Sequence, residues 1–158
     1  MSVDTEAARR EFLTCRLGDE SYGIDILQVQ EIREVRQVTR VPHVSRYVRG
    51  VVNLRGAIVP VVDLGLMFGF DKPIELADAS AIVLNVDGRL VGIVVTAVSD
   101  VIGLADDEIM AAPELGARKI GTAISGIGAR KTADGGREAS VLLLDVPTIM
   151  RRIREEGE

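Results

Sequence analysis

Apolar and polar residues alternate along most of the chain, and this period of two predicts a protein built mainly from β-strands. Residues 12–17 and 22–26 are the first two such stretches, and the Gly-Asp-Glu sequence at 18–20 between them predicts a hairpin. Residues 26–30 fit one helical turn, and residues 29–35 fit a strand with charged side chains on its open side. The apolar residues of this last segment also recur every three positions, so a helix is the alternative there.

The segment 50–64 is the stretch around which the chain is organised, because it predicts two strands, a tight turn and a strand-to-helix corner. Its strands are β-branched and almost wholly apolar, as buried strands are. Asn53 suits the entry to a turn and Gly56 tolerates a positive φ, so Arg55 should project outward. Arg55 is then either a solubilising tip or a partner contact. Asp63 lies where the N-cap of a short following helix is expected.

The second half of the chain has its own hairpin signal, since residues 80–86 and 89–97 flank Asp87 and Gly88. Asp-Gly between apolar runs is typical of a two-residue hairpin turn. The remaining elements are expected in the following order: a strand at 98–104, an irregular surface segment at 105–119, a strand pair at 120–128 and 139–144, and a helix at 146–154 capped by Asp145.

The order of elements repeats between the two halves. Each half begins with a hairpin whose returning strand contains Gly-Ile, at Gly23 and Gly92, and each has a later aliphatic strand that starts at Gly50 or Gly126. This repeat predicts two small all-β subdomains with a groove between them. We expect residues 1–10 to be a flexible arm, residues 11–150 a single domain whose repeat boundary lies near 71–79, and residues 151–158 the charged end of the last helix.

Composition narrows the possible partners. The 158 residues suffice for one domain, and 19 Lys and Arg against 24 Asp and Glu give a net charge of −5, which disfavours nucleic acid. Aromatic residues are only 3% of the chain, so platforms for base stacking are also missing. The single cysteine, Cys15, has no partner for an intrachain disulfide, and the sequence shows neither a membrane span nor a signal peptide. These features predict a cytoplasmic protein.

Motifs for catalysis are missing from the sequence. The one histidine, His43, follows Pro42 in an expected loop, and with Cys15 it makes neither a zinc site nor a persuasive nucleophilic pair. Glycine-rich phosphate loops and the nucleophile-elbow motif are absent as well. We therefore predict no catalytic residues, no metal and no cofactor, and a module that binds proteins. A small enzyme or ligand-binding barrel is the alternative, and the poverty in His, Cys, Trp and Tyr speaks against it.

Four separated blocks of sequence resemble the CheW family of bacterial chemotaxis coupling proteins. They are residues 17–26, 29–33, 53–64 and 91–101, and the likeness extends over nearly all of residues 12–150. The resemblance implies an all-β fold of two five-stranded SH3-like β-barrels with short helices after Asp63 and Asp145. It also implies a non-enzymatic adaptor that couples chemoreceptor tips to the histidine kinase CheA and is recruited to receptor arrays at the membrane. A CheW-type adaptor of another array pathway, such as surface motility or biofilm formation, is a close alternative.

The resemblance also implies which residues meet the partners. The surface for the regulatory domain of a CheA-type kinase would comprise six residues of the first half: Val29, Glu31, Gly50, Asn53, Leu54 and Arg55. The groove that receives the tip of a methyl-accepting chemoreceptor would include Val94 and Val101. Because the segments of Glu31 and Arg55 should be neighbours in the first barrel, we predict an ion pair between these two side chains, which would orient Arg55 for a partner.

Overall fold

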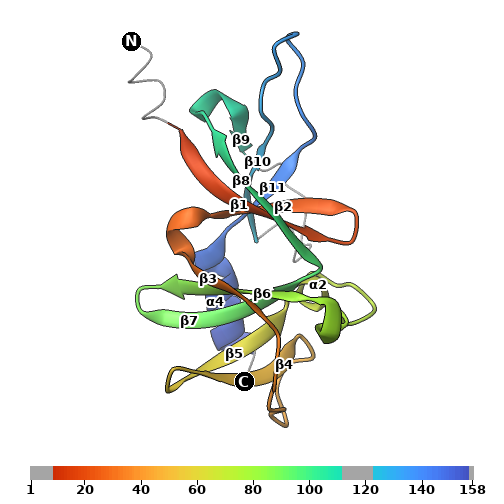
Figure 1. Cartoon of the computed structure of the whole chain (residues 1–158), viewed down its shortest axis with the longest axis vertical. Helices are drawn as coiled ribbons and strands as arrows, with labels where there is room; N and C mark the ends of the chain where they lie inside the picture. Colours follow the sequence, from red (N-terminus) through yellow and green to blue (C-terminus); the bar gives the residue numbers. More distant parts are fainter. Residues whose placement is uncertain (1–8, 112–122, 157–158) are drawn as a thin grey trace.

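Two β-sheets and a C-terminal helix make up the protein in a computed structural model that describes residues 9–111 and 123–156 (Figure 1). Within these residues, the six-stranded sheet has the order β8-β1-β2-β11-β10-β9 and the five-stranded sheet the order β3-β6-β7-β5-β4. The strands are β1 (Arg10–Leu17), β2 (Glu20–Asp25), β3 (Val29–Glu34), β4 (Val48–Leu54), β5 (Ala57–Asp63), β6 (Ser80–Val86), β7 (Arg89–Val95), β8 (Ala97–Leu104), β9 (Ile109–Ala111), β10 (Ile124–Gly128) and β11 (Val141–Leu144). The helices are η1 (Ile26–Gln28), α2 (Leu64–Met67), η2 (Leu76–Asp78), η3 (Asp106–Glu108) and α4 (Val146–Glu156). Residues 1–8 of the predicted flexible arm lie outside the described residues.

The predicted repeat is present, but each sheet takes strands from both halves of the chain. The hairpins β1-β2 and β6-β7 correspond, and each gains a parallel neighbour from the opposite half at an equivalent glycine. Leu143 of β11 lies beside Gly23 of β2, and Val61 of β5 lies beside Gly92 of β7. The strands β6 and β7, which follow residues 71–79, therefore share a sheet with β3, β4 and β5. The short strand β9 gives one sheet six strands instead of the predicted five, whereas the other sheet has only an isolated antiparallel bridge, between Thr39 and Val51, at the equivalent edge.

The two strand-to-helix corners repeat the same hydrogen bonds. Oδ1 of Asp63 accepts the backbone N–H of Leu66 at 2.9 Å, and Oδ1 of Asp145 accepts that of Thr148 at 3.1 Å. These bonds satisfy amide groups that the first turn of a helix leaves unpaired. The structure thus confirms both predicted caps, and α2 and α4 begin directly after them.

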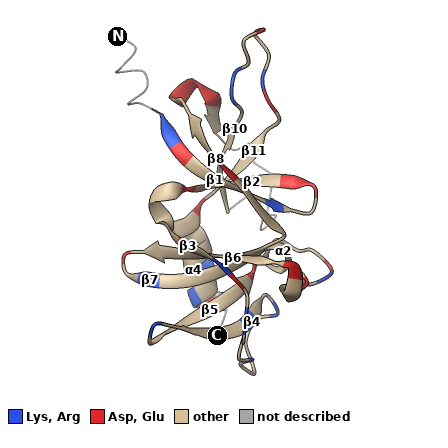
Figure 2. Ribbon diagram, in the orientation of Figure 1, with Lys and Arg blue, Asp and Glu red and all other residues tan. Residues whose placement is uncertain are grey.

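One continuous core joins the sheets. Tyr22 of the six-stranded sheet, Ile82 of the five-stranded sheet and Ile149 of α4 belong to the same buried cluster. Each large side chain buried in this way contributes about 1.5–3 kcal/mol of hydrophobic stabilisation. Figure 2 shows acidic residues on η3 near β9 and basic residues on α4 and at the start of β7, with both signs of charge present at either end of the molecule. No helix within the described ranges is long and apolar enough to span a membrane.

The prediction that residues 105–119 form an irregular segment is wrong in part. Residues Asp106–Glu108 form η3, and Ile109–Ala111 form β9, which pairs with β10. The carboxylate of Glu108 accepts the backbone N–H of Ala105 at 2.8 Å and that of Lys131 at 2.7 Å, which aligns this turn with the strand beside it. The rest of the segment lies outside the described residues, as do residues 120–122 of the predicted strand 120–128, whose described part begins at Ile124.

Candidate partner-binding surface

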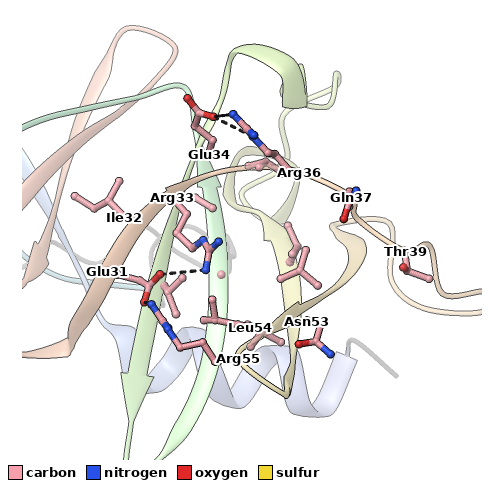
Figure 3. Close-up of a pocket in the computed structure, with 17 residues that line it drawn as sticks. Glu31, Ile32, Arg33, Glu34, Arg36, Gln37, Thr39, Asn53, Leu54 and Arg55 are labelled. Atoms are coloured by element: carbon pink, nitrogen blue, oxygen red, sulfur yellow. Dashed lines mark hydrogen bonds and ion pairs between the residues drawn. The ribbon is translucent and has the colours of Figure 1, made fainter.

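A groove of about 950 Å³ lies on the five-stranded sheet, where β3 faces the turn between β4 and β5 (Figure 3). The strands β3 and β4 are the two edges of this sheet, so the groove is the gap that is left where the curled sheet does not close. Leu54, Val59 and Val83 pack together in its floor, and each is at most 4% exposed. The rim carries charged side chains from β3 and from the turn. An apolar floor with a charged rim is the arrangement of a protein interface.

An ion pair crosses this gap. Nη2 of Arg55 lies 2.7 Å from Oε2 of Glu31, which confirms the pair predicted from the sequence (Figure 3). Nη1 of Arg33 donates to the other carboxylate oxygen of Glu31 at 3.4 Å. The side chain of Arg55 is 67% exposed while that of Glu31 is 21% exposed, so the carboxylate holds a guanidinium that largely faces solvent.

The turn that presents Arg55 is a tight two-residue hairpin turn. Arg55 and Gly56 have φ values of 52° and 89°, and Oδ1 of Asn53 accepts the backbone N–H of Gly56 at 2.9 Å. Positive φ at both central positions is the signature of a type I′ turn. The sequence predicted the positive φ of Gly56 but not that of Arg55, a residue type that seldom adopts it.

A second turn of the same kind joins β6 and β7 and serves as an internal reference. Asp87 and Gly88 have φ values of 52° and 85°, and Oδ1 of Asn85 accepts the backbone N–H of Gly88 at 2.9 Å. The two turns differ at their first central position, where one has Asp87 and the other Arg55. This geometry therefore does not require arginine.

The groove brings together four of the six residues expected at the kinase surface: Glu31, Asn53, Leu54 and Arg55. Val29 is half-buried and packs against the main core. Gly50 is buried at a crossing of two backbone segments, and a Cβ atom there would lie 2.2 Å from the carbonyl oxygen of Thr39.

The two residues expected in the receptor groove have different environments. Val94 of β7 is fully buried in a cluster with Val61 and Ala79. Val101 of β8 is 45% exposed and lies in the other sheet. Of these two valines, therefore, only Val101 has an exposed side chain.

Charged residues just beyond Glu31 also line the groove and were not predicted. Arg33 pairs with Glu31, and Arg36 pairs with Glu34. The partners are two residues apart in each pair. For Glu31 and Arg33, which both belong to β3, this spacing places the side chains on one face of the strand. Acidic and basic residues at a spacing of two are therefore the sequence pattern that could have predicted these ion pairs.

Two ionisable side chains of the six-stranded sheet, Cys15 and Tyr22, are buried. Burial raises the pKa of the Cys15 thiol to about 12, and it also raises the pKa of the Tyr22 hydroxyl. Both groups are therefore uncharged at neutral pH. Within residues 9–111 and 123–156, no cluster of three or more His, Cys, Asp and Glu side chains could hold a metal ion.

Comparison with known proteins identifies the family. Residues 11–154 match the CheW-like domain family. The chain belongs to the CheW family. It is 41% identical to the chemotaxis protein CheW of Klebsiella aerogenes over 92% of this chain and 84% of that protein, and 37% identical to CheW of Rhizobium meliloti over 67% and 68%.

A solved structure agrees with this assignment. The crystal structure of the scaffolding protein TtCheW from Thermoanaerobacter tengcongensis superposes with a TM-score of 0.74 at 30% identity, covering 87% of this chain and 89% of that one. The predicted family and fold are therefore confirmed. This CheW-family chain is a chemotaxis coupling and scaffold protein, not an enzyme.

Proposed function

We propose that the protein joins the tips of methyl-accepting chemoreceptors to a CheA-type histidine kinase, in the cytoplasm at membrane receptor arrays. The groove between β3 and the β4-β5 turn binds the regulatory domain of the kinase, with Arg55 as the central contact. Asn53, Leu54 and Glu31 shape this surface, while Gly50 and Val29 support it from within the barrel. Val101 belongs to the receptor side, and Val94 acts there only through the packing beneath the surface.

The backbone conformation of Arg55 is the observation that carries this proposal. A left-handed conformation at a residue with a side chain costs on the order of 1 kcal/mol, and Asn, Asp or Gly occupy it most readily. The matching turn has Asp87 at this position, so the fold of the turn does not require an arginine. Its ion pair with Glu31 contributes only about 0–1 kcal/mol because the guanidinium is exposed. A contact with a partner explains why an arginine is kept in an unfavourable conformation.

Glu31 gives this arginine a defined direction. An unsupported arginine side chain loses about 2 kcal/mol of rotamer entropy when a partner immobilises it. Here Glu31 already holds the guanidinium at 2.7 Å, and Arg33 holds Glu31 from the other side. Part of the ordering cost is therefore met before binding, which favours association through preorganisation.

The test replaces Arg55 with a residue that suits the turn. Arg55→Asn should leave the melting temperature within about 2 °C of the parent, because the better backbone preference offsets the lost ion pair. The same variant should weaken binding to a purified CheA-type regulatory domain by about tenfold or more, measured by calorimetry. Arg36→Asn is the matched control, since Arg36 lies on the same groove in an exposed pair with Glu34.

A receptor-tip fragment supplies the second arm of the experiment. Val101→Asp should weaken binding of this fragment and leave kinase affinity unchanged, whereas Arg55→Asn should do the reverse. Normal kinase affinity in Arg55→Asn would show that the arginine is a solubilising tip. If the parent protein bound neither the kinase domain nor the receptor tip, the coupling role itself would be rejected.

A further inference from the structure

A second groove, separate from the one at Arg55, runs between α4 and the five-stranded sheet. Its main hollow measures about 230 Å³ and is lined by half-buried or exposed aliphatic side chains of the loop before β4, of β4 itself and of α4: Val41, Val44, Val48, Val51, Met150 and Ile153. Val41 is 38% exposed, which is high for a valine beside other aliphatic residues. This strip of apolar side chains has no covering element within the described residues.

Two arginines that have no side-chain partner among the described residues line this apolar strip. Arg89 and Arg154 line the hollow and also an adjoining one of about 260 Å³, where Arg151 joins them. Among the described residues, the side chains of Arg89 and Arg154 form no hydrogen bond or ion pair. Asp87 is the one carboxylate lining either hollow, so the local charge is positive in a chain whose net charge is −5.

The first groove offers a contrast, because each arginine that lines it already has a carboxylate partner. Glu31 holds Arg55 and Arg33, and Glu34 holds Arg36. In the groove beside α4, Arg151 pairs with Glu155 at 4.0 Å, but Arg89 and Arg154 have no such partner among the described residues. The groove is therefore complementary to a ligand that brings its own carboxylates.

The edge of the sheet beside this groove is already hydrogen-bonded. The backbone N–H and C=O of Val51 both bond to Thr39 at 2.8 Å, and the N–H of Val48 donates to the carbonyl of Ser45 at 2.9 Å. An extended peptide therefore cannot add to β4 as a further strand here. The occupant must satisfy its own backbone groups, as an α-helix does.

We propose that the groove beside α4 docks an amphipathic helix of a partner protein, one that carries aliphatic residues along one face and acidic residues at its borders. Its aliphatic side chains lie between Val41, Val48 and Met150, and its carboxylates meet Arg89 and Arg154. This docking is independent of the kinase surface, because it uses none of the residues around Arg55.

The experiment uses the whole protein and a designed probe. The probe is a synthetic peptide of about 18 residues, long enough to be helical, with Leu on one face and Glu on the flanks. Titrated into ¹⁵N-labelled protein, it should shift the amide signals of residues 41–51 and of α4. A peptide with Lys in place of every Glu should bind about tenfold more weakly or not at all.

Charge reversal makes the test specific. The double variant Arg89→Glu, Arg154→Glu should bind the Glu peptide about tenfold more weakly and gain affinity for the Lys peptide. Lys72→Glu is the matched control, because Lys72 is also exposed and without a partner among the described residues, and it should change the affinity less than about twofold. Val41→Asp tests the apolar strip and should also weaken binding.

Three results would overturn the proposal. The Glu peptide could shift signals around Arg55 in place of those of α4, or its affinity could be unaffected by the double charge reversal. Alternatively, vesicles of phosphatidylglycerol could bind the parent but not the double variant while the Glu peptide fails to bind, which would assign the surface to an anionic membrane.

Discussion

Gly50 and Gly56 both have positive φ values, but only Gly50 has a neighbour where a side chain would go. A Cβ at Gly50 would lie 2.2 Å from the carbonyl oxygen of Thr39, whereas nothing lies within 4 Å of one at Gly56. The sequence indicated the turn role of Gly56 because that role is local. It could not indicate the role of Gly50, since the approach of Thr39 depends on how the chain crosses after β3.

Gly50→Ala is therefore expected to destabilise the protein much more than Gly56→Ala. The free energy of unfolding should fall by at least about 2 kcal/mol in Gly50→Ala, from backbone strain and steric overlap. It should fall by about 1 kcal/mol in Gly56→Ala, from backbone strain alone. Urea unfolding measures both.

Kinase binding of Gly50→Ala, normalised to its folded fraction, should be near that of the parent. A weakened affinity in fully folded protein would instead make Gly50 a direct contact.

Glu108 shows how one buried carboxylate joins distant segments. It accepts backbone N–H groups of Ala105 and Lys131, and Nη1 of Arg9 lies 3.4 Å from Oε1. The two backbone hydrogen bonds lower the pKa of this carboxyl below its usual range. Because the folded-state pKa is depressed, the stabilisation is present above the unfolded value of about 4.3 and is lost as the pH falls through the folded value.

Glu108→Gln should lower the free energy of unfolding by about 2 kcal/mol at neutral pH, because the amide has one acceptor oxygen for two part-buried N–H groups and carries no charge. It should also flatten the decline in stability on acidification below about pH 5. Urea titrations across this range measure both effects. Asp107→Asn is the control: that carboxyl has its pKa lowered mainly by the hydrogen bond from Lys131, but it is exposed, so its change should be small. Equal effects of the two substitutions would contradict the role given to Glu108.

At the scale of elements, the two corners share a cap but differ in what surrounds it. Asp63 is fully buried, and besides the cap bond its Oδ2 accepts the N–H of Ile74 at 2.7 Å and lies 3.4 Å from Nη1 of Arg49. Among the described residues, the side chain of Asp145 makes the cap bond and no other hydrogen bond. Both caps could be predicted because a cap is local, whereas the bond to Ile74 spans 11 residues and needed the structure.

Asp63→Ala should therefore lower the free energy of unfolding by about 2–4 kcal/mol, since it leaves the part-buried amide of Ile74 and the guanidinium of Arg49 without their carboxylate. Asp145→Ala should lower the free energy of unfolding by about 1 kcal/mol, the usual value for the loss of an N-cap side chain. Chemical denaturation of both variants gives the comparison. Equal losses would mean that the contacts with Ile74 and Arg49 add nothing to the first corner.

At the scale of the whole molecule, the sequence predicted the repeat but not how its parts are shared. Turn signals such as Asp87-Gly88 lie within one hairpin, so they are readable from the chain. Which distant strand joins that hairpin depends on contacts such as Val61 with Gly92, and these are set by the burial of both surfaces together. The result is that each half contributes a hairpin to one sheet and further strands to the other.

This exchange predicts that neither half folds by itself. Separating residues 1–78 from residues 79–158 would break four strand pairings: β1 with β8, β2 with β11, β3 with β6 and β5 with β7. Each fragment would then expose sheet edges and half of the common core, which cannot offset the entropy of ordering the chain. Circular dichroism should show both fragments unfolded separately and a native-like spectrum with one cooperative melting transition after mixing. A cooperative transition in either isolated fragment would contradict the shared core and would mean that the pairings inside one half are sufficient.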